Sequence, residues 1–235
     1  MHRTTHVRPP VSVAVSVALG TVGLLLSAPT LLVAQPHAGH EEMQRRHRSS
    51  SAYIAALDNP ERDAYQKPDE VIEALQLQPG ERIADIGAGS GYFSVRLAEA
   101  VGDTGQVWAV DINPDMVLHM NRRLRDAGIT NVRTVLAAPD DPLLPDASVD
   151  RFFICNVWHH VEDQAGYLAL MRRMLRPGGQ VVMVDFQKRD LPVGPRVGMK
   201  IAKADLLAQM ESNDFQLAEE HDFLPYQYFL VFTVQ

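Results

Sequence analysis

Cysteine is almost absent from this chain of 235 residues, in which Cys155 is the only one. A single cysteine excludes an intrachain disulfide and any metal site built on several thiolates, and we expect no metal. Cys155 lies in the apolar run DRFFICNVW (150–158), where a small buried side chain is a better interpretation than a nucleophile. The chemistry of the protein must therefore come from other residue types.

Clustered positive charge is also lacking. The formal net charge is −7, and residues 1–34 contain only Arg3 and Arg8 as charged side chains, which leaves −9 for the remainder. A nucleic-acid surface normally shows grouped lysines and arginines, so we expect no nucleic-acid partner. The balance is typical of an enzyme that acts on small molecules, or of any soluble protein.

The N-terminal segment is the one long stretch without charge. A basic start is followed by 24 uncharged residues, Val11–Ala34, with a small residue at a cleavage point after Ala34. This pattern predicts a signal peptide over 1–34 and an exported, periplasmic or otherwise extracytoplasmic protein. Leu32 is not the ideal small residue before such a cut, so an uncleaved membrane anchor and a start codon placed too early stay open. A polar, aperiodic flexible tether over 35–51 and a domain over 52–235 complete the organisation.

From residue 51 onward, helical and strand patterns alternate, which predicts an α/β fold with a parallel sheet covered on both faces. The last two strand-like runs, 215–224 and 226–234, are joined by a turn around Pro225 and predict a terminal hairpin. The expected strands before it are 82–87, 105–112, 132–137, 149–158 and 180–186, and the expected helices are 68–80, 92–102, 114–128, 165–179 (with its stop) and 203–213.

Three glycines, Gly87, Gly89 and Gly91, stand between the first expected strand and the next helix. Such a turn brings backbone N–H groups and a helix N-terminus to the carboxyl edge of a sheet, where nucleotides bind. Asp111 ends the next strand, 20 residues after Gly91, and an acid there can accept both ribose hydroxyls. In a dinucleotide fingerprint the position of Tyr92 would be glycine or alanine, so the tyrosine disfavours a nicotinamide enzyme.

Four blocks carry a resemblance to a known family: ADIGAGSGYFS, VWAVDINPDM, LPDASVDRFFICNVWHHVED and LRPGGQVVMVDF. In this order and spacing the chain, from about Asp58 to its C-terminus, resembles the class I S-adenosylmethionine-dependent methyltransferases, in the style of the methyltransferase-11 and ubiquinone/menaquinone-biosynthesis group. The resemblance implies a doubly wound, Rossmann-like, seven-stranded sheet of order 3-2-1-4-5-7-6 with strand 7 antiparallel. It also implies S-adenosyl-L-methionine as cofactor.

The resemblance implies roles for particular residues. Gly87, Gly89 and Gly91 would hold the methionine end of the cofactor together with Asp85. Asp111 would hold the ribose.

Three further cofactor contacts follow from the same resemblance. Ile112 would pack against the adenine, and Asn156 would lie near the sulfonium. Many relatives have an acid that binds the adenine amine where this chain has Ala138, so that contact is missing or comes from Asp140 or Asp141.

Methyl transfer to a hydroxyl or an acidic carbon benefits from a base. His159 and His160 are the leading candidates, with Asp185, Lys188 and Tyr226 behind them.

The acceptor would be recognised by segments 51–67 and 187–203. The former contains YQKP (65–68), which resembles the part of the family that closes over the cofactor.

We therefore expect a methyltransferase acting on a small-molecule acceptor, touching a membrane only through an uncleaved anchor. Two alternatives stay open. One is a non-catalytic extracytoplasmic binding protein with the same fold, supported by Ala138, and the other is a nicotinamide-dependent oxidoreductase, opposed by Tyr92.

Overall fold

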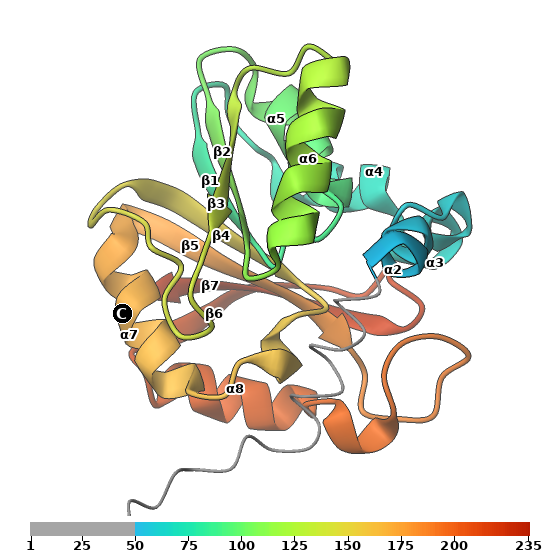
Figure 1. Ribbon diagram of the computed structural model, residues 1–235. Helices are drawn as coiled ribbons and strands as arrows, with labels where there is room; N and C mark the ends of the chain where they lie inside the picture. The colour runs from blue at the N-terminus through green and yellow to red at the C-terminus, as the bar shows by residue number, and fades with distance from the viewer. Residues whose placement is uncertain (1–49) are drawn as a thin grey trace, which may run out of the picture. The chain divides into compact units, whose positions relative to one another are not determined.

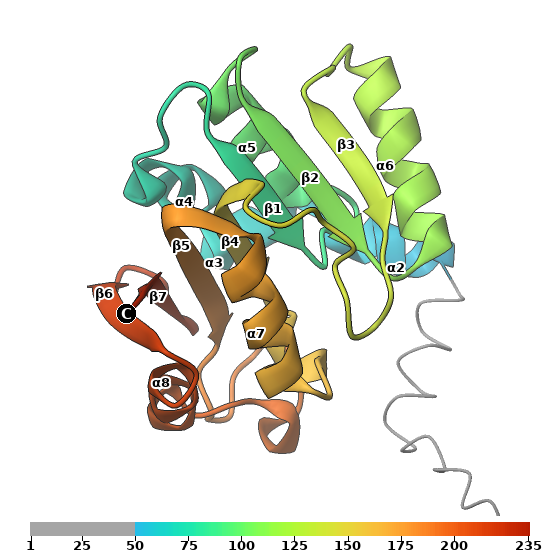
Figure 2. The same ribbon diagram turned by 90° about the vertical axis from the view of Figure 1, so that its left-hand side faces the viewer.

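Residues 50–235, which the computed structural model describes, form three layers, with helices on both faces of one sheet (Figure 1, Figure 2). The sheet has seven strands in the order β3-β2-β1-β4-β5-β7-β6. β7 runs antiparallel to β5 and β6, and the other neighbouring strands are parallel. The predicted fold class, strand order and terminal hairpin are thereby confirmed. The predicted signal peptide and nearly all of the predicted tether lie outside the described residues.

The strands follow the predicted runs closely. They are β1 (Arg82–Ile86), β2 (Gln106–Asp111), β3 (Val132–Leu136), β4 (Val149–Cys155), β5 (Leu175–Phe186), β6 (Phe215–His221) and β7 (Gln227–Val234).

The helices divide between the two faces. Those packed on one face are α4 (Pro68–Leu75), α5 (Tyr92–Val101) and α6 (Pro114–Asp126), and those on the other are α7 (Gln164–Met174) and α8 (Lys203–Glu211). Before α4 come α2 (Ser50–Leu57), the 3-10 turn η1 (Pro60–Arg62) and α3 (Asp63–Gln66), and two further 3-10 turns are η2 (Trp158–His160) and η3 (Val197–Met199). Within residues 50–235, no helix combines the length and the apolar character needed to cross a bilayer.

Helix α6 shows how local sequence sets an element. The side chain of Asn113 accepts a hydrogen bond from the backbone N–H of Asp115 at 2.9 Å, and Pro114 occupies the first helical position. Both features stabilise a helix start. Met116, Met120 and Leu124 recur every fourth residue and are buried, so one stripe of the helix packs on the sheet.

The segment LRPGG (175–179) corrects one prediction. The sequence predicted that this segment terminates a helix, but α7 ends at Met174 and these residues begin β5. The register against β4 jumps from Val149↔Leu175 to Arg151↔Gln180. Pro177 and Gly178 therefore form a bulge within the strand, which the turn-forming composition of the segment concealed.

The carboxyl ends of β1, β2, β4 and β5 meet at one edge of the sheet, as parallel strands require. Because β7 is antiparallel, it brings its first residues to the same edge, with Gln227 opposite Phe186 and Tyr228 opposite Asp185. The candidate site is built at this edge.

Candidate functional site

The glycine turn is fixed by its backbone. Gly87, Gly89 and Gly91 have φ of +67°, +57° and +79°, a region that side chains disfavour. A Cβ on Gly87 would lie 2.4 Å from a methyl carbon of Val157. Helix α5 starts at Tyr92, directly after the turn, so its N-terminus and the turn face the same edge of the sheet.

Asp111 ties this turn to the end of β2. Its Oδ2 accepts a hydrogen bond from the backbone N–H of Gly89 at 2.8 Å, and its Oδ1 accepts one from that of Asn113 at 2.8 Å. A carboxylate oxygen has more than one lone pair and can accept more than one hydrogen bond. The carboxylate is thus oriented by the backbone and suited to bind a pair of hydroxyls.

Ile112 follows Asp111 and is 38% exposed. An exposed branched apolar side chain next to an oriented carboxylate can cover the face of a planar ring. Its position agrees with the predicted adenine contact, which stays a prediction.

Asp85 lies at the centre of the sheet edge and is almost completely buried. Burial raises the pKa of its carboxyl to about 7, the Asp111 charge adds to the rise, and a 2.6 Å hydrogen bond from the Ser94 hydroxyl opposes it. A carboxyl that is near its pKa at neutral pH changes charge readily when a cation binds beside it.

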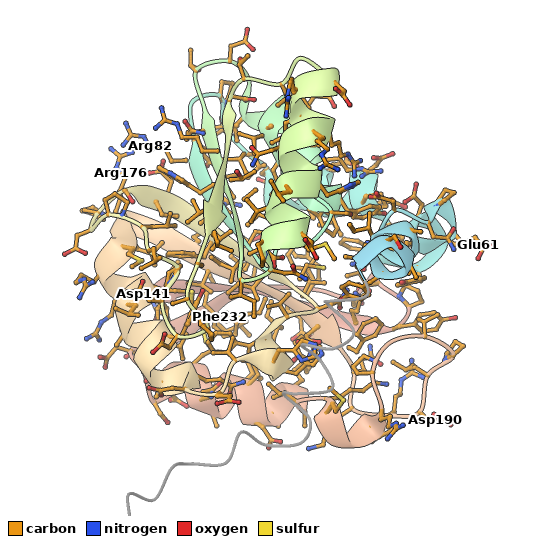
Figure 3. All side chains as sticks on the ribbon, viewed as in Figure 1. Glu61, Arg82, Asp141, Arg176, Asp190 and Phe232 are labelled. Carbon is orange, nitrogen blue, oxygen red and sulfur yellow. The ribbon has the colours of Figure 1, made fainter. Side chains whose placement is uncertain are left out.

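Asp140 and Asp141, predicted to replace the missing adenine-binding acid, lie in a tight turn. Ala138 and Asp141 form an isolated antiparallel bridge, with Asp140 exposed between them. The Asp141 carboxylate accepts a hydrogen bond from the Leu143 backbone at 2.7 Å, and the residue lies toward α7 (Figure 3). Burial, and then the Asp141 charge, raise the pKa of Tyr167 on α7. The Asp141 side chain therefore stabilises its own turn, and Asp140 is the more accessible of the two to a ligand.

The two candidate bases differ in their surroundings. The Nδ1 atom of His159 lies 2.9 Å from both carboxylate oxygens of Asp185, and both side chains are 2% exposed. The His160 ring lies beside it, with ring centroids 4.2 Å apart and the two planes tilted by 48°. Because Asp185 also accepts the Phe186 backbone N–H at 2.8 Å, it is held in place and can orient the His159 ring.

Lys188 and Tyr226, the lesser candidates, lie on the rim. Lys188 is 3.9 Å from the Asp205 carboxylate, and Tyr226 packs against Tyr65 with ring centroids 6.1 Å apart. Neither contacts the His159–Asp185 pair through a bond that the structure shows.

The structure adds two residues that sequence reasoning missed, Gln66 and Gln227. Asn156, which has a φ of +60° at the end of β4, donates from its side-chain amide to Gln66 at 3.0 Å and accepts from Gln227 at 2.8 Å. Gln66 belongs to the YQKP motif, which was a usable signal. Nothing in the strand pattern around Gln227 distinguished it.

Segment 53–58 covers the glycine turn. Leu57 of α2 would contact a Cβ on Gly89 at 3.0 Å, and Asp58 pairs with His119 and Arg123 of α6 at 3.1 and 2.8 Å. Burial, and then the Asp111 charge, raise the pKa of the Tyr53 phenol. Segment 53–58 therefore lies directly over the turn and Asp111.

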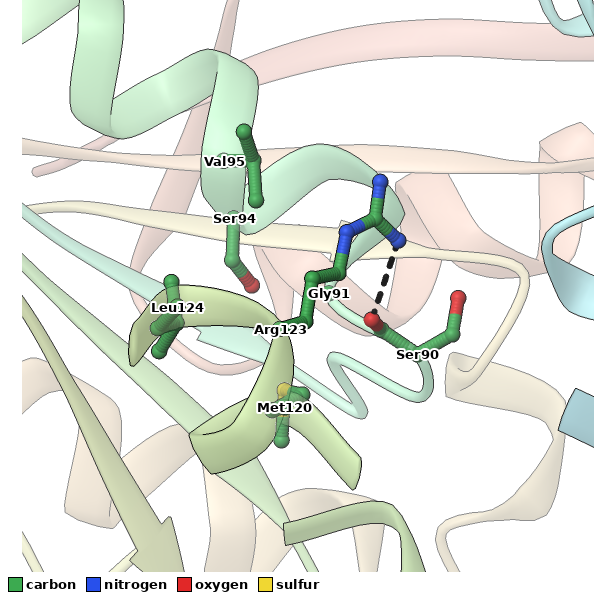
Figure 4. A pocket seen from close by; sticks show the side chains of 7 residues that line it. All are labelled: Ser90, Gly91, Ser94, Val95, Met120, Arg123 and Leu124. Atoms are coloured by element: carbon green, nitrogen blue, oxygen red, sulfur yellow. Dashed lines mark hydrogen bonds between the residues drawn. The ribbon is translucent and has the colours of Figure 1, made fainter. Parts of the chain in front are cut away.

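A small hollow between α5 and α6 adjoins the turn (Figure 4). Arg123 spans it and donates to the carbonyl oxygen of Ser90 at 3.2 Å. The hollow is on the helix side of the turn rather than at the sheet edge, so we assign it a packing role.

Comparison with known proteins decides the family. The family model described as "Methyltransferase domain" matches residues 83–179, which include the glycine turn, Asp111 and His159. This part of the chain is a class I methyltransferase domain. The predicted resemblance is confirmed, and the family implies S-adenosylmethionine as methyl donor.

Curated relatives of this methyltransferase domain carry the name ubiquinone/menaquinone biosynthesis C-methyltransferase UbiE. The chain is 35% identical over 118 residues to that of Shewanella halifaxensis, covering 50% of this chain and 47% of the relative. It is 31% identical over 154 residues to that of Shewanella sediminis, covering 65% and 61%. The matched region thus spans only about half to three fifths of these relatives.

Solved structures agree on the fold. A SAM-dependent methyltransferase from Aquifex aeolicus aligns with a TM-score of 0.75 at 22% identity, covering 78% of this chain and 98% of that one. The DhpI–SAH complex aligns with a TM-score of 0.66 at 20% identity, covering 85% and 98%.

The residues present fit the implied cofactor. The glycine turn has positive φ at three positions, which lets its backbone approach a ligand closely, and two backbone N–H groups orient the Asp111 carboxylate. When bound, S-adenosylmethionine supplies a methyl group on a sulfonium that leaves as a neutral thioether.

Proposed function

We propose that the protein is an S-adenosylmethionine-dependent methyltransferase that acts on a small molecule. One observation supports this most strongly: the bond from the Gly89 backbone to Asp111, which joins the glycine turn to an oriented carboxylate at the end of β2. In the proposed complex, the turn and Asp85 hold the methionine end of the cofactor. Asp111 binds the ribose, Ile112 covers the adenine, and Asn156 lies near the sulfonium.

The chain's contribution to the reaction is positioning and proton transfer. Aligning an acceptor with the methyl carbon converts the displacement into a step within one complex, which can lower the barrier by roughly 7–11 kcal/mol. S-Adenosylmethionine, when bound, would supply the methyl group and would retain the carbon–sulfur electron pair on sulfur. The residues of this chain would take up the acceptor's proton.

His159 is the proposed base. Asp185 accepts a hydrogen bond from Nδ1, which leaves Nε2 as the basic nitrogen and stabilises the ring once it is protonated. His160, beside it in the 3-10 turn η2, is proposed to shape the loop.

The compartment is proposed from the N-terminal sequence alone. A basic start and an uncharged run favour export by a signal peptide, with a membrane anchor as the alternative. A reporter fused after residue 50 and active only outside the cytoplasm would support export. A reporter active only in the cytoplasm would contradict it.

Turnover tests the proposed activity. The full chain is incubated with S-adenosylmethionine and a panel of small molecules bearing hydroxyl groups or acidic carbons, and release of S-adenosylhomocysteine is measured. We expect release that requires one class of acceptor. Tight cofactor binding without release for any acceptor would favour the non-catalytic binding protein.

A further inference from the structure

Three side-chain amides meet beneath α3, from segments far apart in the chain. Gln66 ends α3, Asn156 follows β4, and Gln227 starts β7. Gln227 Nε2 donates to Asn156 Oδ1 at 2.8 Å and to Gln66 Oε1 at 3.2 Å, and Asn156 Nδ2 donates to Gln66 Oε1 at 3.0 Å. We call Gln66, Asn156 and Gln227 the amide cluster.

One hydrogen-bond acceptor of the amide cluster receives no hydrogen bond from the described part of the chain. Gln66 and Gln227 are 0% and 1% exposed, and Gln227 Oε1 has no hydrogen-bond partner within residues 50–235. The oxygens of Gln66 and Asn156 already accept from amide groups of the cluster. A buried amide oxygen without a donor is unfavourable and rare in native proteins. The position therefore suits a ligand that brings a hydrogen-bond donor.

The charges around the amide cluster favour a cationic donor. The side-chain amide nitrogen of Gln66 donates a hydrogen bond to the Cys155 sulfur at 3.3 Å. Burial raises the pKa of that thiol, and while Arg62 opposes the rise, the charges of Asp85 and Asp185 add to it. The negative charges of two buried carboxylates therefore act on Cys155, the direct neighbour of the cluster, and such charges favour a cationic ligand.

We propose that the amide cluster binds the amino-acid end of the cofactor, with the α-ammonium group donating to Gln227 Oε1. The inference rests on the proposed function and extends the cofactor site to Gln66 and Gln227. Asn156, which has a positive φ, has its side chain between the two glutamine amides.

A purely structural role is the competing explanation, in which Gln66 only fastens α3 to the sheet. The two roles differ in which ligands they affect. Loss of a fastening would weaken every ligand of the site alike. Loss of an ammonium contact would weaken only ligands that carry the amino-acid end.

The experiment compares two ligands on the full chain by titration calorimetry. S-Adenosylhomocysteine carries the amino-acid end, and 5′-methylthioadenosine has the same nucleoside and a thioether but lacks it. For Gln227→Met, which removes the amide with little change in volume, we expect affinity for S-adenosylhomocysteine to fall about tenfold or more. Affinity for methylthioadenosine should stay within about twofold. If Gln227→Met does not fold, the affinities of Gln66→Met for the same two ligands are compared instead.

Gln209→Met is the matched control, because Gln209 joins Trp158 and Gln164 in a separate amide network at 2.9 and 2.7 Å. It should change neither affinity. An equal loss for both ligands in Gln227→Met, or no loss for S-adenosylhomocysteine, would overturn the proposal. If the unmodified chain binds neither ligand, the proposed function itself fails.

Discussion

The two halves of the sheet edge are built differently. The main part of the cofactor half lies in one continuous stretch, 85–112, and uses backbone N–H groups, positive φ and carboxylates. The catalytic half, at the ends of β4 and β5, pairs His159 with Asp185, and the amide cluster likewise joins residues from separate segments. A local motif determines the first, whereas tertiary packing determines the second. The halves should therefore respond to substitution in different ways.

His159→Gln should give the largest effect and should be confined to the catalytic half. General-base catalysis contributes about 10²–10⁴-fold, so we expect the rate of S-adenosylhomocysteine release to fall at least about 100-fold. Affinity for S-adenosylhomocysteine should change less than about twofold.

Two companion variants sharpen the assignment. Asp185→Asn should lower the rate substantially because it removes the charge that stabilises the protonated ring, and His160→Gln should lower it much less. If His160→Gln is the more damaging of the two histidine variants, the roles of the histidines are reversed.

Asp111→Ala should weaken cofactor binding strongly. It removes a charged acceptor for two hydroxyls and the bond that ties Gly89 to β2, and we expect Kd for S-adenosylhomocysteine to rise about 100-fold. Asp115→Ala is the matched control, since Asp115 is exposed at the start of α6. Calorimetric affinity that is equal in the two variants would remove the ribose assignment.

Asp85→Asn should stabilise the protein at alkaline pH. The pKa of Asp85 is raised to about 7 from the ordinary 3.8, so the folded state favours the neutral carboxyl. The stability that the neutral carboxyl contributes is fully present below about pH 4 and is lost as the pH rises through 7. We expect the variant to melt about 5 °C or more above the unmodified chain at pH 8.

Thermal unfolding at several pH values checks this. The difference in Tm between the variant and the unmodified chain should shrink toward pH 4. A difference that does not depend on pH would mean that Asp85 is charged throughout.

Ala138→Asp should give the smallest effect, and a gain. It restores the acid that many relatives place beside the adenine amine, and one added hydrogen bond should tighten S-adenosylhomocysteine binding about 3- to 10-fold. Unchanged affinity would indicate that Asp140 already supplies the contact, or that the turn holds Ala138 away from the adenine.

Sequence reasoning reached the cofactor half because its signals are local. Three glycines, an acid 20 residues later and alternating patterns predict the turn and an α/β fold without long-range information, and the strand order followed from the family resemblance. The catalytic half and the amide cluster could not be predicted because their pairs are distant in sequence. Gln66 and Gln227 are 161 positions apart, and His159 and Asp185 are 26 positions apart. The bulge at Pro177 and Gly178 was missed for a related reason, because pairing with β4 outweighs the local turn preference.

Binding of S-adenosylhomocysteine to the full chain tests the central claim most directly, with NAD as the comparison ligand. We expect calorimetry to show one site for S-adenosylhomocysteine and no binding of NAD. NAD has no place because Tyr92, which is 6% exposed and packed edge-on against Phe93, fills the position where a dinucleotide turn needs a small residue. Binding of NAD in preference to S-adenosylhomocysteine, or binding of neither, would contradict the account.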